Sequence, residues 1–154
     1  MPIRVLFLSL FLLGLCSAQE SAFIGHSEPR VVSDLDRHLQ AYLEVWQVRL
    51  NLRKWKIAVL VVPAGDLKAK TLGNIHWDVL TMSAVIRVLS PEDYNPKVKN
   101  ILDDMEETIV HELIHLSLVP FQPENGKTDE ERGTEEVVIS KITQAFLALD
   151  RRSK

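Results

Sequence analysis

The stretch NILDDMEETIVHELIHLSLVPF, residues 100–121, combines a helical spacing of apolar side chains with two histidines four residues apart. Leu102, Ile109, Leu113 and Leu116 recur at the helical period, which predicts an amphipathic helix. Proline is well tolerated at the first position of a helix, so we predict that this helix begins at Asn95-Pro96 and runs to Pro120. Its acidic residues are expected to form a solvated face; they are Asp103, Asp104, Glu106 and Glu107.

The histidines of this helix have the spacing of a metal site. Residues i and i+4 lie one above the other on a helix, so His111 and His115 present their imidazoles to one point. Glu112 lies about 100 degrees around the helix from His111, which places it outside the ligand set and beside the open position of a zinc ion. Zinc lowers the pKa of bound water to about 7, and a neighbouring carboxylate can move the proton to a leaving amine. The pattern predicts metal-assisted hydrolysis; the alternative is a metal-free pair of solvated or core histidines.

A zinc site of this kind needs a third protein ligand. The long metzincin form would carry a glycine and a further histidine shortly after His115, but Leu118 and Phe121 occupy those places. No histidine follows His115, so we expect the third ligand to be a carboxylate of the last predicted helix. Glu135 and Glu136 are adjacent there, and both are candidates.

The rest of the chain predicts an α+β fold. Ser33 with Asp36 has the form of a capping box and starts an N-terminal helix that ends at about Leu52. Thr134 can cap a C-terminal helix over residues 135–149, whose apolar side chains keep the helical period. Between the first helix and the histidine helix, three β-rich runs predict strands. They lie at residues 55–63, 71–78 and 83–89, with the last two forming a hairpin.

The composition of these strands predicts their places in the sheet. Trp55 to Pro63 is a β-branched apolar run, which is typical of an inner strand covered on both faces. Arg87 suits an edge strand with one face in water. We therefore predict a three-stranded sheet whose exposed edge strand runs from Ser83 to Leu89.

Residues 1–18 have the pattern of a secretory signal peptide. A short basic start precedes an apolar run, Val5 to Leu15, which is shorter than the roughly 20 residues needed to span a bilayer. Small residues then provide a cleavage site. We expect export, so that the protein is secreted or periplasmic, and a single domain over residues 19–154 that begins with a loose leader at 19–32.

Charge and cysteine content exclude several kinds of partner and crosslink. The formal net charge is −3, and no basic stretch is present before the terminal residues, so we expect neither nucleic acid nor, after signal cleavage, a membrane as a partner. Cys16 is the only cysteine and leaves with the signal peptide. Without disulfides, the core must be stabilised by packing or by a metal.

The motif HELIH, the segment EEVVIS that contains Glu136, and the hairpin LGNIHWD…SAVIRVL together resemble the gluzincin metallopeptidases, most closely their small minimal members, the minigluzincins. The resemblance covers about Ser33 to Leu149. In that family the ligand glutamate is usually followed four residues later by Asp or Asn. Four residues after Glu136 stands Ser140, a shorter polar substitute, whereas Ile139 stands four after Glu135, so Glu136 matches better.

The resemblance implies a zincin-like fold and one Zn²⁺ per chain, held by His111, His115 and Glu136. It also implies hydrolysis of peptide bonds with Glu112 as the catalytic residue that activates water. An extended peptide or protein substrate would add to the edge strand Ser83 to Leu89 through main-chain hydrogen bonds.

Larger gluzincins carry a tyrosine or histidine beyond the glutamate helix that stabilises the oxyanion. Neither residue type follows Glu136 in this sequence, and Tyr94 and His76 are the remaining candidates. Two alternatives therefore stand beside the peptidase. One is a zinc-stabilised module that binds peptides with little or no catalysis. The other is a latent peptidase whose leader or C-terminal tail fills the cleft until it is trimmed.

Overall fold

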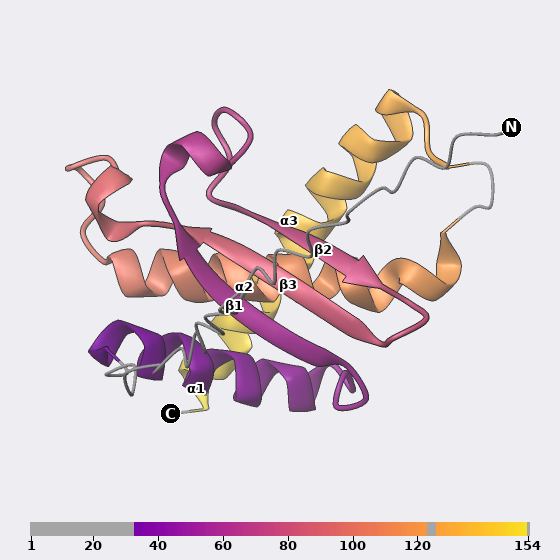
Figure 1. Cartoon of the computed structure of the whole chain (residues 1–154), viewed down its shortest axis with the longest axis horizontal. Coiled ribbons are helices and arrows are strands. Elements are labelled where there is room, and N and C mark those ends of the chain that lie inside the picture. Colours follow the sequence, from indigo (N-terminus) through magenta and orange to yellow (C-terminus); the bar gives the residue numbers. More distant parts are fainter. Residues whose placement is uncertain (1–32, 123–125, 154) are drawn as a thin grey trace, which may run out of the picture. The chain divides into compact units, whose positions relative to one another are not determined.

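Within residues 33–122 and 126–153, which the computed structural model describes, the chain forms three α-helices and one three-stranded sheet (Figure 1). This confirms the predicted α+β class. The predicted signal peptide and leader, residues 1–32, lie outside the described residues. In chain order the elements are α1 (Asp34–Arg49), β1 (Lys56–Val62), η1 (Ala64–Asp66), β2 (Gly73–Asp78), β3 (Ser83–Leu89), η2 (Pro91–Asp93), α2 (Ile101–Leu118), η3 (Val119–Phe121) and α3 (Asp129–Arg152).

The sheet has the order β1-β3-β2, so β3 is its central strand. β3 pairs with β1 in parallel and with β2 antiparallel, and the β2–β3 pair confirms the predicted hairpin. Val59, Ile86 and Ile75 lie side by side in one row across the three strands. Ile86 is fully buried, and exposure alternates along β1 and β3. One face of the sheet therefore packs against the helices.

Two predictions about the strands were wrong. Ser83–Leu89 is not the edge strand but the centre of the sheet, and the run expected to be an inner strand, β1, is an edge strand. The second edge is β2. Arg87 is compatible with a central strand because it projects from the face opposite the fully buried Ile86 and Val88. Side-chain alternation reports which face of a strand is wet, and it does not report the neighbours of that strand.

Helix α2 begins later than predicted. Asn100 is its N-cap and accepts a hydrogen bond from the backbone N–H of Asp103, whereas Asn95-Pro96 lies in the turn before it. The Asn95 side chain accepts from the N–H of Lys97, which satisfies the turn locally and competes with a helical start. The predicted capping box at Ser33, by contrast, is confirmed at the start of α1.

Helix α3 begins earlier than predicted, because a capping box between Thr128 and Glu131 starts it. Thr134 lies inside the helix and caps nothing, and the glycine before it is accommodated in the helix. The buried face also differs from the predicted apolar stripe. Ile139, Thr143 and Leu147 are buried, while the more apolar-looking Val138 and Leu149 are exposed.

The three helices meet around Trp46, which is 2% exposed. Its indole N–H donates to the Glu106 carboxylate of α2 at 2.8 Å, and its ring stacks on Phe146 of α3 with ring centroids 6.5 Å apart. Arg49 covers the same indole and pairs with Asp150 of α3. Glu106 is therefore a buried hydrogen-bond acceptor and not part of a solvated face as expected. Through these contacts, the C-terminal half of α3 is held against α1 and α2.

Gly73 allows β2 to approach α2 closely. A Cβ at this position would lie 2.4 Å from Thr108 Cγ2 and 2.6 Å from the carbonyl oxygen of Arg87. We therefore expect Gly73→Ala to lower the free energy of unfolding by about 1–3 kcal/mol, the usual cost of overpacking. Urea denaturation measures the loss, and Gly65→Ala is the matched control because nothing lies within 4 Å of the added Cβ. Equal stability of the two variants would contradict the close approach.

None of the helices within residues 33–122 and 126–153 combines the length and the apolarity needed to cross a membrane.

Candidate metal centre

The two histidines of α2 converge as the helical spacing predicts. Nε2 of His115 lies 3.1 Å from Nε2 of His111, with the ring centroids 4.9 Å apart. The side chains are 16% and 21% exposed respectively, so both rings are largely shielded but reachable from solvent. Leu113, Ile114 and Leu116 anchor this part of the helix in the core, which orients the imidazoles outward.

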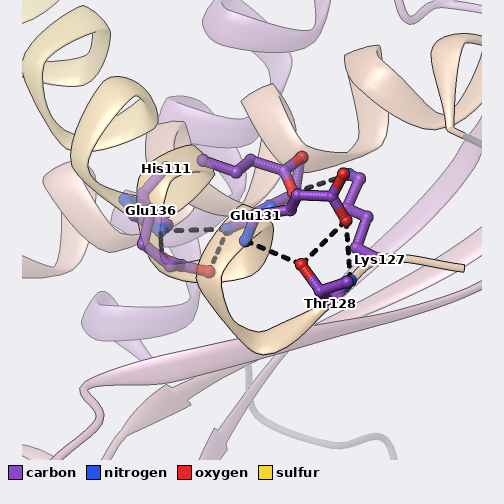
Figure 2. Close-up of polar contacts among 7 residues, drawn as sticks. His111, Lys127, Thr128, Glu131 and Glu136 are labelled. Carbon is purple, nitrogen blue, oxygen red and sulfur yellow. Dashed lines mark hydrogen bonds and ion pairs between the residues drawn. The ribbon is translucent and has the colours of Figure 1, made fainter.

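Glu136 of α3 reaches both imidazoles. Its Oε2 lies 3.1 Å from Nε2 of His111, and its Oε1 lies 3.2 Å from Nε2 of His115 (Figure 2). The packing of Ile139 and Thr143 into the core turns this side of α3 toward α2. In Figure 1, α3 crosses α2. The contacts of Glu136 with His111 and His115 join these two helices.

The donor atoms of His111, His115 and Glu136 all lie within 4.8 Å of one another, so the group can hold a metal ion. The chemistry fits zinc, which binds imidazole nitrogen and carboxylate oxygen at about 2.0–2.2 Å. Ligand atoms arranged tetrahedrally at such bond lengths are about 3.3 Å apart. The two imidazole nitrogens are 3.1 Å apart, and they lie 3.1 and 3.2 Å from the two different oxygens of the Glu136 carboxylate.

Burial lowers the pKa of the His115 imidazole below its ordinary value, against the opposing effect of the Glu136 charge. The neutral imidazole is the form that binds metals, so this shift favours ligation.

Glu112 is a carboxylate beside the cluster and outside it, and it is 8% exposed. Burial raises its pKa to about 8, and the negative charge of Glu136 adds to the effect. A divalent cation at the cluster would oppose both influences, because it favours the charged carboxylate. Glu112 thus lies where its proton affinity depends on the neighbouring charges.

The cluster lies in a groove of about 1110 Å³ between β2, α2 and α3. Leu72, Ile75 and Trp77 provide apolar lining from the edge strand and the residue before it. Glu112, the predicted catalytic residue, and Ser140, which stands four residues after Glu136, also line this groove. Its ionisable residues are Lys68, Lys70, Asp104, Glu107, His111, Glu112, His115, Asp129, Arg132 and Glu136.

The two oxyanion candidates from the sequence do not line this groove. His76 lies on the edge strand but faces away from Ile75 and Trp77, as alternation along a strand requires. Tyr94 is 7% exposed; burial raises its pKa to about 12, and the Asp104 charge adds to the effect. Ser140 lies one turn beyond Glu136, and among the described residues it makes no hydrogen bond to either histidine.

Glu135, the competing candidate for the third ligand, has a different partner. Its Oε2 accepts from the ammonium of Lys127 at 2.5 Å, and the two side chains are 16% and 20% exposed. Figure 2 shows Lys127 and Thr128 at the start of α3, beside the contact between Glu136 and His111. The structure therefore brings Glu136 to the histidines and joins Glu135 to a cation.

Sequence reasoning missed several groove residues, among them Lys68, Lys70 and Arg132. Lys68 and Lys70 come from the loop before β2, and Arg132 lies before residue 135, the predicted start of the C-terminal helix. The Thr128/Glu131 capping box was the one available signal, since it places Arg132 within the first turn of a helix. No local pattern indicated that Lys127 pairs with Glu135.

No protein-family model matches this chain, and neither a curated protein nor a solved structure matches it.

Proposed function

We propose that this protein is an exported zinc-dependent metallopeptidase of the gluzincin type, related to the minigluzincins and built on a zincin-like fold. The observation that carries the proposal is the convergence of His111, His115 and Glu136 in a groove that also holds the buried carboxylate of Glu112. Export rests on the sequence of residues 1–18 alone. N-terminal sequencing of the exported protein tests it, with Gln19 as the expected first residue.

In this proposal each residue of the cluster has a separate task. His111, His115 and Glu136 hold the metal, and zinc in such a site acts as a Lewis acid that makes water and a substrate carbonyl more reactive. Glu112 takes the proton of the attacking water on a carboxylate oxygen. It then donates that proton to the leaving amine nitrogen as the peptide bond breaks, which returns Glu112 to its starting state.

The edge strand β2 is the proposed binding surface for an extended polypeptide. Among the described residues, β2 pairs with β3 on one side and with no strand on the other, so within this part of the chain its outer edge presents unpaired backbone groups. Its residues line the groove that contains the cluster. A peptide that adds to this edge by main-chain hydrogen bonds would lie across the metal-binding residues. The substrate strand assigned to Ser83–Leu89 from the sequence is thus replaced by Gly73–Asp78.

A second candidate function, a zinc-stabilised peptide-binding module with little or no catalysis, is favoured by one observation. Neither Tyr94 nor His76 lines the groove, so neither can stabilise an oxyanion there. The same edge strand and cluster would then bind a peptide without cutting it.

Metal depletion and reloading of the purified chain test the proposal. We expect a chelator to abolish cleavage of unstructured peptides and one equivalent of Zn²⁺ to restore it, because the three proposed ligands hold a single ion. Once a substrate peptide is known, a version of it that is methylated on its backbone nitrogens should bind less tightly, since it can no longer add to β2. Quenched-fluorescence assays and mass spectrometry of the products measure both effects. Zinc binding without any cleavage would favour the binding module, and no zinc binding would refute the metal site itself.

A further inference from the structure

Glu135 and Glu136 are adjacent carboxylates of α3, but only Glu136 belongs to the metal-binding cluster. Glu136 contacts both histidines, whereas Glu135 lies outside the group whose donor atoms are within 4.8 Å of one another. Glu135 is the residue next to Glu136 on α3, and its negative charge raises the pKa of His115 against the effect of burial. It is also only 16% exposed, so it is poorly solvated. A partly buried carboxylate on the helix that supplies a metal ligand needs a partner, and an unpaired one would be attracted to the metal.

Lys127 supplies that partner, and its position is fixed by the start of α3. It immediately precedes the N-cap Thr128, whose side chain accepts from the backbone N–H of Glu131 at 3.2 Å. The Glu131 carboxylate accepts in return from the N–H of Thr128 at 2.7 Å (Figure 2). These reciprocal bonds hold the backbone next to Lys127, and its ammonium lies 2.5 Å from Oε2 of Glu135.

The consequence concerns the number of ligands around the metal. Catalytic zinc sites have three protein ligands and an open fourth position, while sites with four protein ligands are closed and structural. We propose that Lys127 is a positioning residue that keeps Glu135 away from the metal, so that Glu136 is the only carboxylate ligand and the fourth position stays open. This inference rests on the proposed metal site and does not require that the site be catalytic.

Replacing the cation tests the inference through the coordination of Co²⁺. In Lys127→Met the Glu135 carboxylate loses its partner and is expected to join the metal as a fourth protein ligand. The visible absorption spectrum of the Co²⁺-loaded chain should change, because the d–d bands depend on ligand number and geometry. Metal affinity should rise by about tenfold, the scale on which groups around the ligands alter binding. Any peptidase activity should fall while metal content stays at one equivalent.

Three further variants separate coordination from charge. Lys127→Arg keeps the ion pair and should retain the wild-type Co²⁺ spectrum. Glu135→Gln should also retain it, because Glu135 is not a ligand in the wild-type chain. Lys127→Met/Glu135→Gln has no carboxylate to recruit and should return to the wild-type spectrum. A changed affinity with an unchanged spectrum in Lys127→Met would reflect charge alone and would overturn the proposal.

The remaining outcomes also decide the question. If Lys127→Met is unfolded without metal, Zn²⁺ should restore its fold at a lower concentration than it restores the fold of Lys127→Met/Glu135→Gln, because only the single variant can add Glu135 as a ligand. A chain that stays unfolded with Zn²⁺ would show that Lys127 acts only as a structural partner. Because the readouts are metal spectra, affinity and folding, a wild-type chain that binds Co²⁺ but cuts no peptide still tests Lys127. A wild-type chain that binds no Co²⁺ would refute the metal site on which the inference rests.

Discussion

Glu112→Gln is expected to reduce kcat/KM for peptide cleavage by about 10²–10⁴-fold, the usual contribution of a general acid–base residue. Glutamine has nearly the same shape, so the packing around this 8% exposed side chain should be kept. The amide, however, cannot take a proton from water or donate one to the leaving amine. Because Glu112 is outside the ligand group, the variant should still bind one equivalent of zinc.

The combination of retained metal and lost cleavage is what distinguishes Glu112 from a ligand. Metal content is measured by atomic absorption and kcat/KM with the best cleaved peptide. Glu130→Gln, on the exposed first turn of α3, is the matched control and should behave as the wild-type chain does. Cleavage that disappears in Glu112→Gln would reject the non-catalytic binding module. Cleavage that persists at the wild-type rate would remove Glu112 from the mechanism.

Glu136→Ala is expected to weaken zinc binding by more than about 100-fold, since even changes outside the ligand shell cost 10- to 100-fold. The variant leaves two imidazoles, and two ligands do not complete the three that catalytic zinc sites use. The side chain is 56% exposed, so its removal should leave the stability of the metal-free chain nearly unchanged. Competition with a chromogenic chelator measures the affinity, and thermal unfolding without metal measures the stability.

The comparison with Glu135 makes this test specific. Glu135→Ala removes the neighbouring carboxylate of the same helix, which is paired with Lys127 and not with the histidines. It should retain zinc with nearly wild-type affinity, although loss of a partly buried ion pair can lower stability. If Glu135→Ala loses zinc and Glu136→Ala keeps it, the assignment of the third ligand is reversed. If neither loses zinc, the ion is bound elsewhere or by the histidines with another group.

The features that depend on neighbouring residues in the sequence were predictable. Ser33 and Asp36 form the expected capping box, and the β2–β3 hairpin forms between the expected runs. His111 and His115 converge because residues four apart on a helix share one side. The helix boundaries were less accurate, since the Asn100 cap and the Thr128/Glu131 capping box compete with other plausible starts nearby.

The position of each strand in the sheet was not predictable in this way. Arg87 alone predicts an edge, but the helices pack on one face of the sheet, so a polar residue also fits the other face of a central strand. The apolar content of β1 likewise reflects burial of one face and not two neighbours. Contacts between segments that are far apart in the sequence determine which strands pair, and the pattern of one strand does not predict them.

The sequence by itself determined that two histidines and a glutamate lie on adjacent turns of one helix, because helical geometry is set within a few residues. Only the tertiary structure decided which carboxylate joins them. The burial of Ile139 and Thr143 rotates α3 so that Glu136 meets the histidines, while Lys127 pairs with Glu135. That choice depends on how two helices cross, and a crossing is set by packing between segments that are far apart in the chain.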